Sequence, residues 1–407
     1  MKRCIAAILS IALMLASSGC TKLEQEHFDK SMGYDQTGTA EIEAQLTYTI
    51  DPDVFMRAAY AIADSGEEYD EDALDDMRLY LNEDKKCVVT FYEKAVTDFD
   101  KNYSDVDVSA GINGITLNCG KVYSRGDVAY YDKRFAYTIG TISFFTAGSD
   151  FYDLGDYYTK LDEIFGDKQY LRISMKSAKG GTSNMKELSK GYYNNAKTLL
   201  NGYEPNLVTK IPNGTRFEIS SKNLTSVSKN FFKHIKNKKT ETAEFVNDYL
   251  DTSLALSADL AGDEASYMLE MARLFEVSPS DIVESATSAN EFLNSGEYKA
   301  FIDNFDFSLV NDITEKDGIL TSEAEFSLSS NDKNAVYMTA LQTTTPVKKA
   351  EFDKIDESSC IDYMKFVRDI ADFEPYPDYE GGFSDEELPF YGGYEEEDYL
   401  PESNLIG

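Results

Sequence analysis

The chain has 407 residues, enough for roughly two to four average domains or for one large domain with appendages. Hydrophobic residues make up 42% and aromatic residues 13% of it, which excludes a wholly disordered protein. Lys and Arg total 39 against 73 Asp and Glu, and the resulting net charge of -34 argues against nucleic acid as a partner.

The N-terminus has the pattern of an export signal. Lys2 and Arg3 precede an apolar run over residues 5–15, and small residues then lead to Cys20. A basic start, a short apolar run and a small-residue exit are typical of a secretory signal, and the run is too short to span a bilayer.

The residues before Cys20 resemble the lipobox of bacterial lipoproteins, in which such a cysteine becomes the lipid-modified first residue of the mature protein. Ser18 and Gly19 fit this pattern, whereas Ser17 stands where a lipobox usually has leucine. We therefore expect residues 1–19 to be a lipoprotein signal peptide and Cys20 to carry palmitate-type acyl chains. Ordinary cleavage without a lipid is the alternative.

The next segment, 20–39, is polar and lacks periodicity, so we expect a flexible tether between the anchor and the folded domain. No later run of about 18 apolar residues follows, so no second membrane pass is expected. The lipid would hold the protein on the extracytoplasmic face of the cell membrane.

Clean alternation of polar and apolar residues over 41–50 predicts a half-buried strand. Asp51 and Pro52 then suit the cap and the first position of a helix. Spaced apolar residues around 70–82 predict a second helix.

A period of two returns between 85 and 133. It predicts consecutive antiparallel strands over 87–94, 105–112, 115–122 and 127–133. Asn113 and Gly114 supply a two-residue hairpin turn because both tolerate positive φ.

The centre, roughly 140–304, is expected to be mainly helical, with a short strand pair near 206–220. Its clearest helix start is at Ser278, which caps the helix while Asp281 takes the place of the usual Glu in a capping box.

Strand periodicity resumes near 305 and continues to 346, with turns at Asp317-Gly318 and Asn331-Asp332. Two strand meanders, 40–133 and 305–346, thus flank the helical middle of one domain spanning 40–373. The simplest assembly is an α+β fold, a curved, half-barrel-like antiparallel sheet with helices packed on its concave face.

The last segment, 374–407, has no Lys or Arg and holds four of the nine prolines. Like charge with Gly and Pro predicts a disordered acidic tail. Its loose aromatic-acidic repeat could alternatively be an interaction motif.

Positive charge gathers in the segment 168–239, where 15 Lys and Arg stand against three Glu, a net +12. Such a segment could contact an anionic lipid headgroup or wall polymer, or it could pair with the protein's own acidic parts. The candidate contact residues combine cations with apolar neighbours in one helical stretch: Lys229, Lys233, Lys236, Lys238 and Lys239.

Little catalytic chemistry is available. The chain has two histidines, His27 and His234, and lacks the common zinc protease, hydrolase and nucleotide-binding motifs. Cys87 and Cys119 could pair, but no cysteine spacing suggests zinc. We expect no catalytic residues, no metal site and no cofactor; a hydrolase with paired carboxylates is the alternative, and the absence of Trp argues mildly against a sugar cleft.

Residues 126–132 and 316–321 are similar in style to the strand hairpins of lipoprotein half-barrels related to LolA and LppX. The layout over 40–350 resembles these proteins, although the long helical middle departs from their simplest members. In such folds the sheet wraps an apolar cavity for acyl chains, so the resemblance implies a carrier or binder of hydrophobic molecules. No ligand residue carries over, because no motif matches.

Together these features predict a non-enzymatic, lipid-anchored envelope lipoprotein that binds a hydrophobic small molecule or lipid. The alternative is a surface interaction protein that contacts anionic wall polymer or a protein partner through segment 168–239 or the acidic tail.

Overall fold

A computed structural model describes residues 21–32, 36–63, 85–147, 154–174, 197–248 and 277–371, with isolated positions 82, 191, 194 and 195. The predicted signal peptide, Cys20, the predicted helix at 70–82 and the acidic tail lie outside the described residues.

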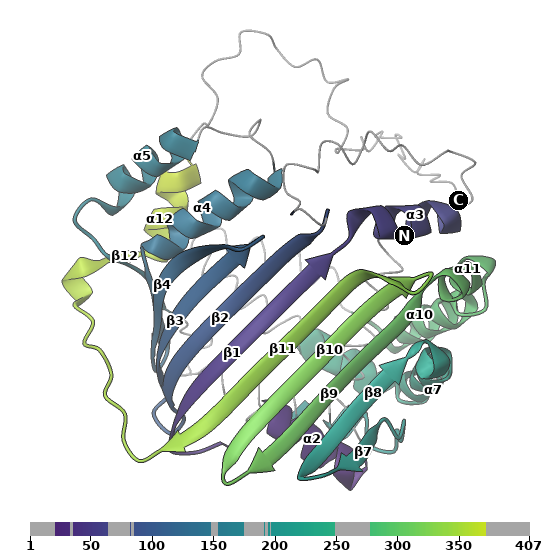
Figure 1. Cartoon of the computed structure of the whole chain (residues 1–407). Helices are drawn as coiled ribbons and strands as arrows, with labels where there is room; N and C mark the ends of the chain where they lie inside the picture. Colours follow the sequence, from purple (N-terminus) through teal and green to yellow (C-terminus); the bar gives the residue numbers. More distant parts are fainter. Residues whose placement is uncertain are drawn as a thin grey trace, which may run out of the picture.

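The described chain is an α+β fold built on one large, open sheet of twelve strands, in the order β12-β6-β5-β4-β3-β2-β1-β11-β10-β9-β8-β7 (Figure 1). All neighbouring strands pair antiparallel except β12 and β6. The strands are β1 (Thr39–Ile50), β2 (Cys87–Asp98), β3 (Tyr103–Ile112), β4 (Ile115–Arg125), β5 (Val128–Asp132), β6 (Tyr170–Ser174), β7 (Val208–Ile211), β8 (Gly214–Ser220), β9 (Asp306–Lys316), β10 (Ile319–Ser330), β11 (Lys333–Val347) and β12 (Cys360–Asp362).

Helices connect the strands and gather towards the two ends of the sheet. They are α2 (Lys22–Met32), α3 (Pro52–Ala63), α4 (Arg134–Ala147), α5 (Leu154–Phe165), α7 (Ser221–Asn237), α10 (Pro279–Phe292), α11 (Gly296–Asn304) and α12 (Tyr363–Ala371), with a 3₁₀ turn at Glu357–Ser359.

The predicted strands and hairpins are confirmed. Both meanders and the pair β7–β8 are present, and Asn113 and Gly114 have φ of 49° and 87°, as the short hairpin turn requires. The predicted starts of α3 and α10 are confirmed as well: the Asp51 carboxylate accepts from the Val54 N–H at 3.1 Å, and the Asp281 carboxylate accepts from the Ser278 N–H at 2.7 Å.

The two meanders form one sheet because β1 pairs with β11 over twelve successive residues, from Thr39 opposite Val347 to Ile50 opposite Val336. Residues directly opposite in a ladder point to the same side of the sheet. One row that follows these pairs from β8 to β3 is Phe217, Asn311, Ala324, Ala340, Leu46, Phe91 and Ala110. We call the side to which this row points the helix face and the opposite side the open face.

Both helix groups pack on the helix face. At one end, Phe217 of β8 forms a core with Leu224 and Phe231 of α7 and with Phe28 of α2. At the other end, Ile361 of β12 packs with Leu161, Phe165 and Ala136. Strand pairs connect Ile361 through Leu171, Tyr131, Val122, Val106 and Ala95 to Ile42, which shares its side of β1 with Leu46.

The predicted flexible tether is wrong for Lys22–Met32, which forms α2 and docks on the sheet. Its start is a reciprocal capping box: the Thr21 hydroxyl accepts from the Glu24 N–H at 3.2 Å, and the Glu24 carboxylate accepts from the Thr21 N–H at 3.1 Å. The segment reads as polar because two of its buried residues, Glu24 and His27, are themselves polar.

Glu24 and His27 are each 1% exposed, and both are hydrogen-bonded. The other Glu24 oxygen accepts from the Leu207 N–H at 3.1 Å, ahead of β7, and His27 Nδ1 lies 2.9 Å from Thr215 Oγ1 on β8. A buried polar group without a partner would be costly, so these bonds fix the position of α2 on the sheet.

Burial lowers the pKa of His27 to about 4, although a hydrogen bond to Asn311 and the charge of Asp312 oppose this shift. As the pH falls, the His27 imidazole therefore becomes protonated near pH 6.5 in the unfolded chain but only near pH 4 in the folded chain. The contribution of neutral His27 to the free energy of unfolding is therefore fully present above the His27 pKa of the unfolded chain. It is lost as the pH falls towards the His27 pKa of the folded chain.

We expect the free energy of unfolding to fall by about 2–3 kcal/mol between pH 7 and pH 4.5 because of His27 alone. His27→Gln keeps a hydrogen-bonding side chain but does not titrate, so it should lack this component. Urea denaturation of both proteins at the two pH values measures it. An equal pH dependence in the two proteins would contradict the assignment to His27.

Candidate ligand-binding site

An apolar pocket of about 360 Å³ lies on the helix face, between strands β5 and β6 and helices α4, α5 and α12. These helices lie together at the end of the molecule opposite α2 (Figure 1). The lining residues are Tyr131, Asp132, Phe135, Ala136, Ile139, Tyr157, Phe165, Leu171, Ile173, Tyr363 and Phe366.

The floor of the pocket follows from strand alternation. Tyr131 of β5 pairs with Leu171 of β6, so both side chains point to the helix face, and Ile173 is two residues further along the same side. The opposite wall is aromatic: Phe165 of α5 is 1% exposed, and its ring centroid lies 5.6 Å from that of Phe366 on α12.

Helices α4 and α5 can approach closely because Gly140 has no side chain. A Cβ atom at this position would lie 2.0 Å from Cε1 of the Tyr157 ring. The Tyr157 hydroxyl in turn donates to the Ala136 carbonyl at 3.4 Å. The shape of the pocket wall therefore depends on this glycine.

The electrostatics of the pocket suit an uncharged ligand. Of the described residues that line it, only Asp132 carries a charge, and its carboxylate is held by Arg134 through contacts of 2.7 and 3.0 Å. Burial, and to a lesser degree neighbouring Tyr363, raises the pKa of Tyr131, so its phenol stays neutral. Ile139 also lines the pocket and is 48% exposed.

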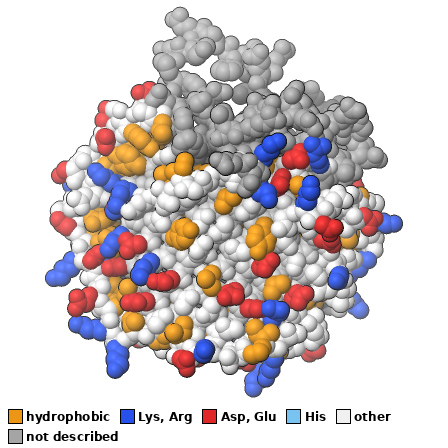
Figure 2. Space-filling model, in the orientation of Figure 1, with side chains coloured by type: hydrophobic (Ala, Val, Ile, Leu, Met, Phe, Trp, Pro, Cys, Tyr) orange, Lys and Arg blue, Asp and Glu red, His pale blue; other side chains and the backbone are white. Residues whose placement is uncertain are grey.

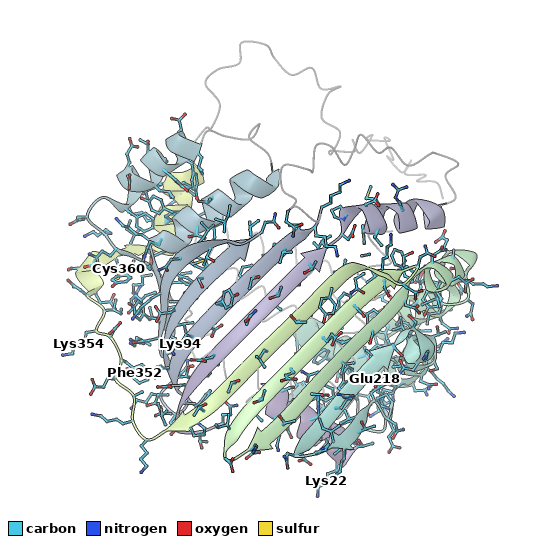
Figure 3. All side chains as sticks on the ribbon, viewed as in Figure 1. Lys22, Lys94, Glu218, Phe352, Lys354 and Cys360 are labelled. Carbon is cyan, nitrogen blue, oxygen red and sulfur yellow. The ribbon has the colours of Figure 1, made fainter. Side chains whose placement is uncertain are left out.

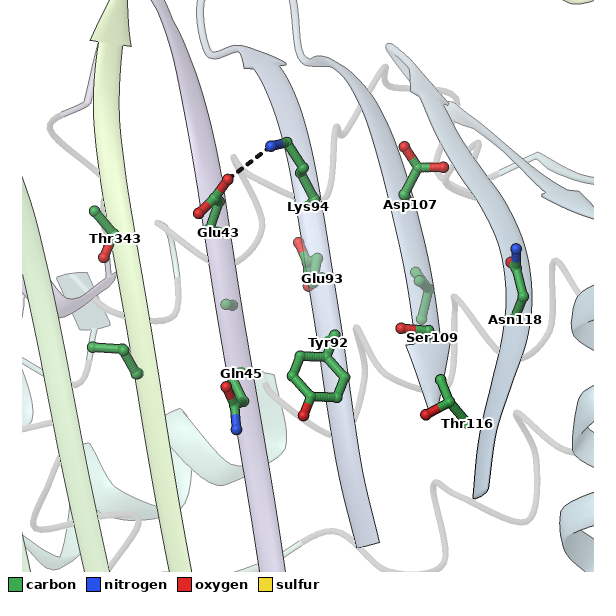
Figure 4. A pocket seen from close by; sticks show the side chains of 13 residues that line it. Glu43, Gln45, Tyr92, Glu93, Lys94, Asp107, Ser109, Thr116, Asn118 and Thr343 are labelled. Atoms are coloured by element: carbon green, nitrogen blue, oxygen red, sulfur yellow. Dashed lines mark hydrogen bonds and ion pairs between the residues drawn. The ribbon is translucent and has the colours of Figure 1, made fainter. Parts of the chain in front are cut away.

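A second hollow, of about 570 Å³, lies on the open face over β1–β4 and β11 (Figure 4). Register pairs set Glu43, Lys94, Asp107 and Lys121 in one row of alternating charge. Lys94 Nζ lies 2.8 Å from Glu43 Oε1, and this hydrogen bond and charge raise the pKa of Lys94. Both side chains are largely exposed, so the pair adds little stability.

Three acids line this hollow: Glu43, Glu93 and Asp107. Lys94 stands between Glu43 and Asp107 in the row and bonds to Glu43, whereas burial raises the pKa of Glu93. A hydrolase with paired carboxylates stays an alternative prediction. Charges of both signs are interspersed over the part of the open face that Figure 2 shows in colour.

The five predicted anionic-contact lysines lie on α7 and just beyond it, away from the apolar pocket. The apolar side of this helix is not available to a membrane, because Phe231 is 4% exposed and belongs to the core with α2 and β8. Lys229 donates to Asn294 Oδ1 at 2.6 Å, and Lys236 donates to Thr287 Oγ1 at 3.2 Å. Anionic contact by these lysines stays a prediction.

Other parts of the basic segment pair with acids of the protein itself. Arg216 on β8 binds Asp312 on β9 at 2.6 Å, and Lys197 binds Asp29 of α2 at 3.0 Å. Arg172 on β6 lies 3.2 Å from Glu357.

Cys87, Cys119 and Cys360 are free thiols. Within the described ranges, no helix has the length and apolarity needed to cross a bilayer, and no three His, Cys, Asp or Glu residues come together as a metal site would require. Comparison of the chain with protein families, with curated proteins and with solved structures finds no match.

Sequence reasoning missed the pocket because its parts are short and distant. Strands β6 and β12 have five and three residues, and the latter begins 186 positions after the former ends. The available signal was the aromatic content of 131–165, which is typical of a core as well as of a binding site.

We expect Gly140→Ala to lower the free energy of unfolding by about 1–3 kcal/mol, because the new methyl group would overlap the Tyr157 ring. Gly296→Ala is the matched control, since nothing lies within 4 Å of its Cβ position at the start of α11. Urea denaturation midpoints compare the two variants. Equal stability of both would show that Tyr157 moves aside at no cost.

Proposed function

We propose that this chain is a non-enzymatic, lipid-anchored, extracytoplasmic protein that binds an apolar or lipid-like ligand. The observation that supports this most directly is the pocket between β5, β6, α4, α5 and α12, with its aromatic and aliphatic lining and its neutralised Asp132. Ligand pockets are typically about 300–1,000 Å³, and apolar lining is their usual character.

The size of the pocket narrows the ligand class. At about 360 Å³ it is at the small end of the usual range, which favours a small apolar molecule or part of one acyl chain over a whole phospholipid. In this proposal the helix face is the concave side of a half-barrel-like sheet, as in the lipoproteins related to LolA and LppX.

We expect Ile139→Asp to weaken binding of the neutral apolar probe N-phenyl-1-naphthylamine at least tenfold, because a carboxylate would then line the pocket and would lose water on binding the probe. Ile139 is already 48% exposed, so the variant should fold. Ile115→Asp, at a 66% exposed hairpin position, is the matched control.

Fluorescence titration of the probe measures both variants against the unmodified protein. As a second measurement, native mass spectrometry of protein extracted from its host membrane should detect a co-purified apolar molecule. Identical probe affinity in all three proteins, together with no co-purified molecule, would rule out this pocket as the binding site.

The anchor is a separate part of the proposal. We expect Cys20→Ser to lose palmitate labelling and to leave the membrane fraction, because no acylated thiol remains to insert into the bilayer. Cys87→Ser removes a described free thiol and should stay membrane-bound. A Cys20→Ser protein that remains in the membrane fraction would contradict lipid anchoring at this residue.

A second candidate function is contact with anionic wall polymer or with a protein partner. What favours it is the position of the lysines on α7: Lys222, Lys233 and Lys236 are exposed, while the other side of the helix lies in the core.

A further inference from the structure

We infer that one end of the strands, with the hairpin turns that lie there, faces the bilayer at headgroup distance. The protein is then held at the membrane in a fixed orientation. We call this end the anchor edge: the start of α2 at Lys22, the β7–β8 turn at 212–213 and the β9–β10 turn at 317–318. The inference rests on the proposed lipid anchor at Cys20 and adds the surface that the anchor presents to the membrane.

Very few residues separate the proposed lipidated residue from the part of the chain that is bonded to the sheet. Thr21 directly follows Cys20, and its N–H and hydroxyl both donate to the Glu24 carboxylate, at 3.1 and 2.9 Å. Glu24 is 1% exposed and is bonded to the Leu207 N–H. Two residues of extended chain reach at most about 7 Å, so the acylated cysteine cannot stand far from α2.

The contacts of α2 place it at one end of the strands. His27 meets Thr215, next to the β7–β8 turn, and Lys30 Nζ lies 3.2 Å from Glu315, next to the β9–β10 turn. Lys22 lies at the lower end of the molecule in the view of Figure 3, the end at which these turns lie.

The chemistry of the anchor edge suits an anionic bilayer surface. Lys22, Lys210 and Lys316 are exposed there, against the exposed acids Glu315 and Asp317, of which Glu315 is paired with Lys30. Ile319, an exposed apolar side chain at 38%, follows the β9–β10 turn. Surface Lys residues are attracted to anionic lipid, and a single lipid chain holds a protein more firmly when it has such a second contact.

The orientation bears on the ligand pocket. Helices α4, α5 and α12 lie at the end of the molecule remote from α2 (Figure 1). The pocket between these helices would then lie away from the anchoring membrane.

The chain contains no Trp, which allows a direct test with one introduced fluorophore. Ile319→Trp and Lys333→Trp are matched variants, because they replace the first residues of the neighbouring antiparallel strands β10 and β11, at opposite ends of the sheet. Strand β10 has twelve residues, so its ends are roughly 40 Å apart.

Each full-length lipidated variant is reconstituted in phosphatidylglycerol–phosphatidylcholine vesicles, and Trp quenching by a lipid with a nitroxide on its headgroup is measured. We expect the quenching slope of Ile319→Trp to exceed that of Lys333→Trp at least threefold. Flotation of the same samples measures independently the fraction of protein that is bound to the vesicles.

Protein that floats but shows equal or reversed quenching would overturn the orientation and leave the anchor intact. Protein that fails to float would overturn the anchor, and the orientation with it. Protein that floats with the expected asymmetry would support both.

Discussion

The pairing of β1 with β11 is the contact on which the rest of the structure depends. It joins residues 39–50 to residues 336–347, which most of the chain separates, in an unbroken register of twelve pairs. Without it the two meanders would be separate sheets with independent faces. With it, alternation fixed in one meander is carried into the other, and both helix groups lie on the same side.

Much of this architecture could be predicted from local pattern. Alternating apolar residues and the Asn113-Gly114 turn specify strands and register through nearest neighbours, so β1–β5 and β9–β11 are readable from sequence. Helix α2 was not predicted, because the Thr21–Glu24 capping box is a weak signal on its own and because the buried side of the helix includes the polar residues Glu24 and His27. The ligand pocket was unreadable, since Tyr131, Leu171 and Phe366 meet only after the sheet has formed.

The polar core under α2 gives the N-terminus a definite place. Apolar packing by Phe28 alone would hold the helix against β8 but would leave its position along the strand weakly specified. Glu24 and His27 add directional bonds to Leu207 and Thr215, which are satisfied in one position only. Thr21 and the start of α2 therefore have a fixed location relative to the twelve strands.

An open sheet has two outermost strands, and here both are very short: β7 has four residues and β12 has three. Unpaired backbone groups on an outer strand can recruit the same strand of another molecule. The short outer strands of this sheet offer few free N–H and C=O groups, so neighbouring copies have little backbone on which to build a continuous fibre.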